Sequence, residues 1–233
     1  MFDPKLKEAL SRVQKPGRYT GGEPGSVYKD KEKVDVRFAF CFPDTYEVGM
    51  SFLGEKILYE LLNSHENWWC ERVFMPEKDF EEQMRENGIP LYALESLDPI
   101  KDFDFIGFTL QYELSYTNVL EMLDLAGLPV YASERKSLYP LVVGGGPCAC
   151  NPEPIADFFD LFVIGEGEEV NVELLELYEK MKPENPTKEQ FLREAAKIEG
   201  VYVPSFYDIT YNDDGTVKAI VPKYEDVPTK VKK

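Results

Sequence analysis

Four short loops carry the residues best placed for chemistry, and each loop follows an apolar run. They span residues 43–50, 109–113, 144–147 and 165–168. Carboxylate, hydroxyl and amide groups in these loops can hydrogen-bond a ligand, and their glycines let the backbone approach it closely. Open α/β sheets bind ligands in the loops at the carboxyl ends of parallel strands. The sequence therefore predicts a ligand site built from these four loops.

The thiol and imidazole groups do not have the spacing of a metal site. Cys41, Cys70, Cys148 and Cys150 form no CxxC or CxxxCxxC motif, and the last two are a lone CxC pair. We predict small buried or loop thiols. His65 is the single histidine and lies in a polar stretch after a predicted helix, where it would be solvated. This count excludes a histidine-rich metal site.

Five apolar runs alternate with helical patterns along the middle of the chain. Runs rich in β-branched and aromatic residues predict strands, and apolar residues three and four apart predict helices. The predicted strands are Val34–Phe42, Cys70–Phe74, Phe105–Leu110, the run from Leu141 into the glycines, and Leu161–Ile164. The predicted helices span residues 51–63, 78–87, 113–125 and 168–181; the first turns Phe52, Ile57, Leu58, Leu61 and Leu62 toward the sheet, and Gly88 caps the second.

This alternation predicts an α/β fold of the flavodoxin-like type. We expect a doubly wound five-stranded parallel sheet in the order 2-1-3-4-5, with helices on both faces. The switch point then lies between the first and third strands. The loops Asp44–Gly49 and Thr109–Glu113 should flank the ligand crevice there.

Two appendages flank this domain, which we place at residues 34–182. Residues 1–33 form an N-terminal arm that either lies over the domain as an ordered cover or contacts another domain. Residues 183–233 form a C-terminal extension with a helix over residues 188–199 and a β-hairpin, because Asp214-Gly215 is a strong hairpin signal.

The net charge of −17 opposes binding to a phosphate backbone. No apolar run approaches the roughly 20 residues that span a bilayer, and the N-terminus has no apolar signal region. We therefore expect a cytoplasmic protein that binds neither nucleic acid nor membrane. The sequence makes no prediction of oligomeric state.

Over nearly its whole length, the chain resembles the N-terminal region of cobalamin-binding-domain radical S-adenosylmethionine (SAM) proteins. The matching motifs are Arg18-Tyr19-Thr20-Gly21-Gly22-Glu23-Pro24-Gly25, Pro43-Asp44-Thr45-Tyr46-Glu47-Val48-Gly49-Met50, Gly144-Gly145-Gly146-Pro147 and Gly165-Glu166-Gly167-Glu168.

The resemblance implies that the chain holds cobalamin for radical chemistry in a separate catalytic barrel. That barrel, an iron–sulfur oxidoreductase with its 4Fe–4S cluster and SAM, would lie beyond Lys233, since this chain has no CxxxCxxC and is not catalytic alone. The implied cofactor-binding residues are Asp44, Tyr46, Glu47, Gly49, Met50, Thr109, Gln111, Gly144, Gly145, Gly146, Pro147, Gly165, Glu166 and Gly167.

One residue departs from the pattern of cobalamin domains. Their DxHxxG loop supplies a histidine ligand to cobalt, but this loop reads Asp44-x-Tyr46-x-x-Gly49. A phenol with a pKa of ~10 is a poor cobalt ligand at neutral pH, so binding without a histidine ligand is expected. Thr109, Gly144 and Gly145 match the small residues that admit the nucleotide tail.

Three alternatives remain open. The domain could be a cofactor-free interaction module that shapes substrate access or domain assembly. The domain could also be a flavin-binding flavodoxin, but its first loop would then have to bind phosphate. The carboxylates of Asp44 and Glu47 in this loop oppose that. Glu166 could cap a helix or lie at a contact between domains.

Overall fold

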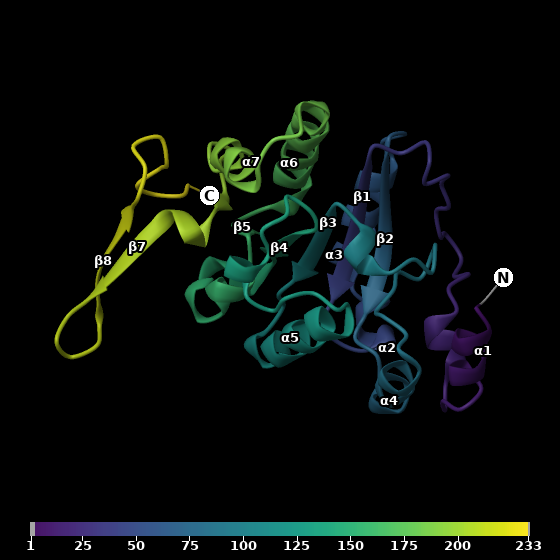
Figure 1. Ribbon diagram of the computed structural model, residues 1–233. Helices are drawn as coiled ribbons and strands as arrows, with labels where there is room; N and C mark the ends of the chain where they lie inside the picture. Colours follow the sequence, from purple (N-terminus) through teal and green to yellow (C-terminus); the bar gives the residue numbers. More distant parts are fainter. Residues whose placement is uncertain (1–2, 233) are drawn as a thin grey trace.

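Six strands form the central sheet, in the order β2-β1-β3-β4-β5-β6 (Figure 1). The computed structural model describes residues 3–232. The first five strands are parallel, which confirms the predicted order 2-1-3-4-5. The strands are β1 (Val36–Phe42), β2 (Trp68–Phe74), β3 (Phe105–Thr109), β4 (Leu141–Gly145), β5 (Leu161–Val163) and β6 (Val201–Tyr202).

The sixth strand is a correction to the five-stranded prediction. β6 runs antiparallel to β5, with Phe162 opposite Tyr202 and Val163 opposite Val201. Two residues are too few to show a period of two in the sequence. Gly200 precedes them with a φ of 88°, a left-handed conformation that suits glycine and turns the chain back along the sheet.

Helices cover both faces of the sheet (Figure 1). α6 and α7 lie on the face of Phe105, whose ring packs edge-on against Tyr178 and Phe191, and α3 packs beside α6. α4 and α5 cover the other face. The helices are α1 (Pro4–Leu10), α2 (Tyr46–Gly49), α3 (Leu53–Asn63), α4 (Lys78–Asn87), α5 (Tyr116–Leu125), α6 (Gly167–Met181) and α7 (Lys188–Ala195).

Several predicted helix details differ in the structure. The helix predicted from residue 51 begins at Leu53, and the one predicted from residue 113 begins with a 3₁₀ turn before Tyr116. The helix predicted to residue 199 ends at Ala195. Gly88 caps α4 with a φ of 64°, as predicted.

The buried face of α3 is more polar than expected. Its buried residues are Glu55, Tyr59 and Leu62, whereas Ile57 is 44% exposed and was wrongly assigned to the sheet face. Apolar periodicity cannot find this face, because a glutamate and a tyrosine occupy two of its positions.

The N-terminal arm runs along the edge of β2 (Figure 1). Tyr19 stacks on Phe80 of α4, with ring centroids 4.1 Å apart. Farther along, the ammonium of Lys29 donates to the carbonyls of Asn63, His65 and Trp68 at 2.9, 2.5 and 2.5 Å. These carbonyls end α3 and begin β2, so the arm satisfies backbone acceptors that the helix leaves open.

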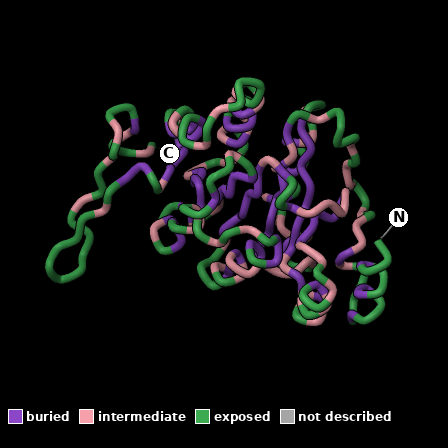
Figure 2. Tube along the Cα trace, in the orientation of Figure 1, coloured by how far each residue is buried: buried purple, intermediate pink, exposed green. Residues whose placement is uncertain are grey.

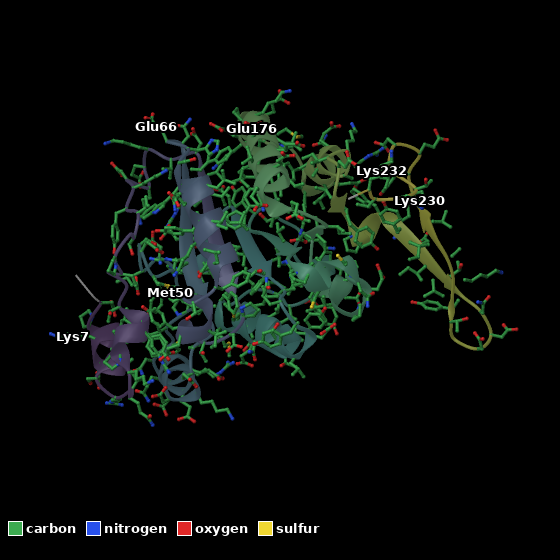
Figure 3. All side chains as sticks on the ribbon, turned by 180° about the vertical axis from the view of Figure 1, so that it is seen from behind. Lys7, Met50, Glu66, Glu176, Lys230 and Lys232 are labelled. Carbon is green, nitrogen blue, oxygen red and sulfur yellow. The ribbon has the colours of Figure 1, made fainter. Side chains whose placement is uncertain are left out.

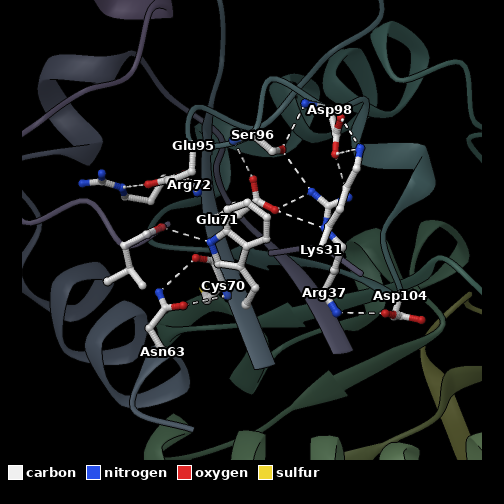
Figure 4. A network of polar contacts seen from close by, with 12 residues as sticks. Lys31, Arg37, Asn63, Cys70, Glu71, Arg72, Glu95, Ser96, Asp98 and Asp104 are labelled. Carbon is white, nitrogen blue, oxygen red and sulfur yellow. Dashed lines mark hydrogen bonds and ion pairs between the residues drawn. The ribbon is translucent and has the colours of Figure 1, made fainter. Parts of the chain in front are cut away.

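Charged pairs hold a second segment against the same edge (Figure 4). Glu71 and Arg72 are consecutive on β2 and point to opposite faces. Glu71 lies 2.5 Å from the guanidinium of Arg37, and Arg72 lies 2.8 Å from Glu95. The backbone N–H of Leu94 donates to the carbonyl of Arg72. The segment at residues 92–98 therefore covers the edge strand, which would otherwise leave its backbone unpaired.

The predicted hairpin is present and projects from the domain (Figure 1). It consists of β7 (Tyr207–Tyr211) and β8 (Val217–Pro222), and most of it is exposed (Figure 2). The following residues return to α7, where Asp226 pairs with Arg193. Within residues 3–232, no helix has the length and apolarity to cross a membrane.

Candidate functional site

A cavity of about 520 Å³ lies where β1, β3, β4 and β5 end, between the sheet and helices α3 and α6. We call it the strand-end cavity. Three of the four predicted loops contribute to its lining, and the first loop, residues 43–50, does not. The lining residues are Phe38, Phe40, Phe52, Gly54, Leu58, Gly107, Phe108, Thr109, Gln111, Val143, Gly145, Gly146, Pro147, Cys150, Val163, Gly165, Glu166, Gly167 and Asn171.

Two glycines on neighbouring strands of its sheet wall differ in the space beside them. A Cβ added to Gly107 would lie 2.3 Å from the ring of Phe38, so that ring fills the space. A Cβ added to Gly145 would meet only the carbonyl oxygen of Val163, at 4.0 Å. Open space therefore begins at Gly145.

Polar groups at the cavity are bonded to one another. The side-chain amide of Gln111 donates to the hydroxyl of Thr109 at 2.6 Å, and the amide of Asn171 donates to the carbonyl of Gly167 at 2.7 Å. Gly146 has a φ of 91° and would place a Cβ 3.0 Å from the carbonyl oxygen of Leu110. A side chain at that position would be strained as well as crowded.

The structure brings eight of the predicted site residues together and leaves six outside the cavity. Thr109, Gln111, Gly145, Gly146, Pro147, Gly165, Glu166 and Gly167 line it. Asp44, Tyr46, Glu47, Gly49, Met50 and Gly144 are not part of its lining.

Gly144 is outside because neighbouring residues of a strand point to opposite faces. A Cβ there would lie 2.6 Å from the ring of Phe162 and 3.1 Å from that of Phe159, on the face away from α3. Gly144 therefore allows the rings of Phe159 and Phe162 to pack closely on the opposite face. Of the two glycines, only Gly145 leaves space for a ligand.

The first loop is directed toward β2 and the arm. It contains the helical turn α2, where a loop was expected. The ring of Tyr46 packs edge-on against Phe74, and the Sδ of Met50 accepts a hydrogen bond from Arg72 at 3.5 Å. From behind, Met50 lies toward β2 and the N-terminal arm (Figure 3). Gly49 is required here, since a Cβ would lie 2.2 Å from the ring of Phe74.

The two loops that flank the switch point touch each other. The hydroxyl of Tyr112 donates to the carboxylate of Asp44, and the amide of Asn118 donates to the carbonyl of Pro43 at 2.9 Å. Glu166 occupies the N-cap position of α6, but its side chain accepts no hydrogen bond from the helix. It is exposed at the cavity.

Comparison with known proteins identifies the family. Residues 54–204 match the family described as radical SAM proteins, N-terminal, and this match covers more than half of the chain. The chain belongs to that family. It is also 29% identical over 193 residues to a Methanocaldococcus jannaschii protein named "Uncharacterized protein MJ0966". That match covers 82% of this chain and 33% of the relative, so the chain spans about a third of the relative's length. No solved structure matches it.

Sequence reasoning missed about half of the residues that line the cavity of this radical SAM N-terminal domain. Gly54 could have been found, because glycine inside a helix costs stability and indicates a close approach. Here the ring of Phe52 would lie 2.7 Å from its Cβ. Phe38 and Phe40 could also have been found as alternate residues of one strand face.

Within residues 3–232, this domain has no cluster of metal-ligating side chains. His65 stacks on Trp68, with ring centroids 3.9 Å apart. It precedes β2, so it lies at the amino end of the strands, opposite the cavity. Burial raises the pKa of Tyr46 and, more strongly, the pKa values of the Cys41 and Cys70 thiols. Those groups stay protonated at neutral pH and are poor metal ligands.

Proposed function

We propose that this radical SAM N-terminal domain binds cobalamin and inserts the nucleotide tail into the strand-end cavity. The open space beside Gly145 carries the proposal. A flat ring system can pack directly against the backbone of a strand only at a residue that has no Cβ. Gly145 is such a residue, at the carboxyl ends of the strands. A cavity of about 520 Å³ also lies within the usual size range of small-molecule sites.

The cobalt in this proposal has no histidine ligand. His65 lies at the far end of the sheet, and Tyr46 packs against Phe74 with its phenol protonated. Affinity would come from the buried tail and from contacts around the corrin ring. When bound, cobalamin would supply a group-carrying cobalt for chemistry in the radical SAM region of the same polypeptide, where the 4Fe–4S cluster and SAM would belong.

Equilibrium dialysis against hydroxocobalamin tests the proposal with three variants. Gly145→Val should weaken binding strongly, because its branches fill the open space without a backbone clash. Gly17→Val adds the same atoms in a place with no neighbour within 4 Å, outside the cavity, and should leave binding unchanged. Tyr46→Phe should be nearly silent. No retention by the wild-type chain, or equal retention by Gly145→Val, would contradict the proposal.

A cofactor-free interaction module is the second candidate, and exposed leucines favour it. Leu53 is 68% exposed at the start of α3, and Leu114 is 88% exposed after β3. Both follow strands whose carboxyl ends flank the switch point, where a second domain could cover them. If this candidate is correct, the chain retains no cobalamin. In the longer polypeptide, Leu114→Ser would then expose the junction between domains to limited proteolysis, whereas Tyr131→Ser, at an exposed apolar residue elsewhere, would not.

A further inference from the structure

The buried side chains in the walls of the strand-end cavity are almost entirely hydrocarbon. Phe38 and Phe40 of β1 are 3% and 5% exposed, and their rings are 6.3 Å apart. Val143 and Val163 are each 3% exposed on β4 and β5. Carbon walls and aromatic rings favour a flat apolar guest, which contacts them without leaving a polar group unpaired.

The buried lining contains only two polar side chains in the described part of the chain, Thr109 and Asn171. Each is already bonded within the protein: the Thr109 hydroxyl accepts from Gln111, and the Asn171 amide donates to Gly167. The hydroxyl proton of Thr109 and, on Asn171, the amide oxygen and one amide N–H remain for a ligand. These three groups, from the end of β3 and the start of α6, are fewer than the polar groups of a purine.

From these walls we infer that the cavity selects among cobamides by the base at the end of their tail. It should favour an apolar base of the benzimidazole or phenol type over a purine. This inference rests on the proposed function and adds the chemical class of the ligand.

The difference between the bases is one of hydrogen bonding. A purine carries an exocyclic amino group and several ring nitrogens, and the cavity cannot pair them all. Unpaired buried polar groups cost free energy that they do not cost in water. Dimethylbenzimidazole carries a single free ring nitrogen, and its methyl groups can contact Phe38, Phe40 and Val143. Shape alone would admit either base, so polarity decides.

Dialysis of the whole chain against three corrinoids tests the inference. We expect cobalamin to bind at least tenfold more tightly than the adenine-tailed cobamide. Cobinamide, which has no tail, should bind more weakly than cobalamin. Gly145→Val should bring the affinity for cobalamin down to that for cobinamide, and leave cobinamide itself unchanged.

Each other outcome has a distinct meaning. Equal or tighter binding of the adenine-tailed cobamide overturns the base preference but leaves the proposed function standing. Equal binding of cobinamide and cobalamin overturns the role of the cavity as the tail site. Binding of none of the three overturns the proposed function, and this inference with it.

A matched pair of substitutions separates wall polarity from general damage. Val143→Thr places a hydroxyl in the cavity wall and should reduce the preference for cobalamin over the adenine-tailed cobamide severalfold. Val142→Thr is the same change one residue earlier, fully buried on the opposite face of β4. It should cost comparable stability and leave the preference unchanged. An equal change in both variants, or in neither, would contradict the inference.

Discussion

Arg18 of the N-terminal arm holds Glu47 of the first site loop, with the guanidinium 2.8 Å from the carboxylate. The same guanidinium lies 3.1 Å from Glu77, at the start of α4. A glutamate expected to contact a cofactor is therefore engaged by an arm that begins before the first strand. The arm therefore contacts α2, the helical turn that also carries Tyr46.

Arg18→Met should loosen the arm without unfolding the domain. Glu47 is nearly half exposed, so its ion pair with Arg18 should contribute no more than about 1 kcal/mol. We expect faster hydrogen exchange in residues 15–25 and in α2, with β3 and β4 unchanged. A double-mutant cycle with Glu47→Gln measures the coupling. Additive effects of the two substitutions would show that the pair does not fasten the loop.

Alanine substitutions at two glycines of β3 and β4 should have opposite consequences for stability. Gly107→Ala places a Cβ 2.3 Å from the ring of Phe38 and should destabilise by about 1–3 kcal/mol. Gly145→Ala enters open space in a strand and should be neutral or slightly stabilising. Urea denaturation compares them. Combining Gly107→Ala with Phe38→Leu should recover part of the loss, whereas similar losses for both glycines would contradict the open space at Gly145.

The buried carboxyl of Glu55 should make stability depend on pH. The side chain is 1% exposed and neither oxygen has a hydrogen-bond partner. Burial raises its pKa from 4.5 to about 8, although Arg72 opposes the shift. The folded state thus binds this proton more tightly than the unfolded state. The free energy of unfolding contributed by Glu55 should therefore fall as the pH rises from about 4.5 to about 8.

Glu55→Gln removes this titration and should flatten the pH dependence. Relative to wild type, the variant should gain about 1 kcal/mol per pH unit across that window. Urea midpoints at pH 5.5, 7.0 and 8.5 measure the trend. Glu60→Gln, at an exposed position of the same helix, should follow wild type. Parallel curves for wild type and Glu55→Gln would show that Glu55 does not titrate in this range.

The cysteines should report on the cavity by their reactivity. Cys150 is exposed and lines the cavity, whereas Cys41 and Cys70 are fully buried. Cys148 is half-buried, and burial raises its pKa, which lowers its thiolate fraction. Iodoacetamide should label Cys150 first, then Cys148, and the buried pair only on unfolding. Hydroxocobalamin should slow the labelling of Cys150. Mass spectrometry follows each site, and unchanged labelling of Cys150 with bound cofactor would contradict the tail position.

Local patterns predicted most of the fold because the spacing of apolar residues within each strand or helix is enough to identify it. The apolar runs at Val36–Phe42 and Leu141–Gly145 are interior strands of the sheet, and the Asp-Gly pair closes the hairpin as expected. β6 could not be found in this way, since its two residues pair with β5 only after Gly200 turns the chain.

The candidate site was harder to predict because its geometry depends on distant contacts. Alternation along β4 indicates that Gly144 and Gly145 face opposite ways, but not which of them faces α3. In the structure α2 packs on Phe74 of β2 and is paired with Arg18, which lies 29 residues before Glu47. No pattern within residues 43–50 contains that information.

The arm's contacts also set an order of events during synthesis. Lys29 donates to carbonyls 34 to 39 residues later in the chain, and Arg18 pairs with Glu77. The carbonyl of Tyr19 accepts a hydrogen bond from the hydroxyl of Tyr92, 73 residues downstream. The Lys29 bonds cannot form until the start of β2 has left the ribosome, the Arg18 pair until Glu77 has, and the Tyr19 bond until the segment after α4 has. The N-terminal arm, although it is translated first, thus reaches its native contacts only after residues in the middle of the domain have been made. The arm therefore covers the edge of the sheet at a late stage.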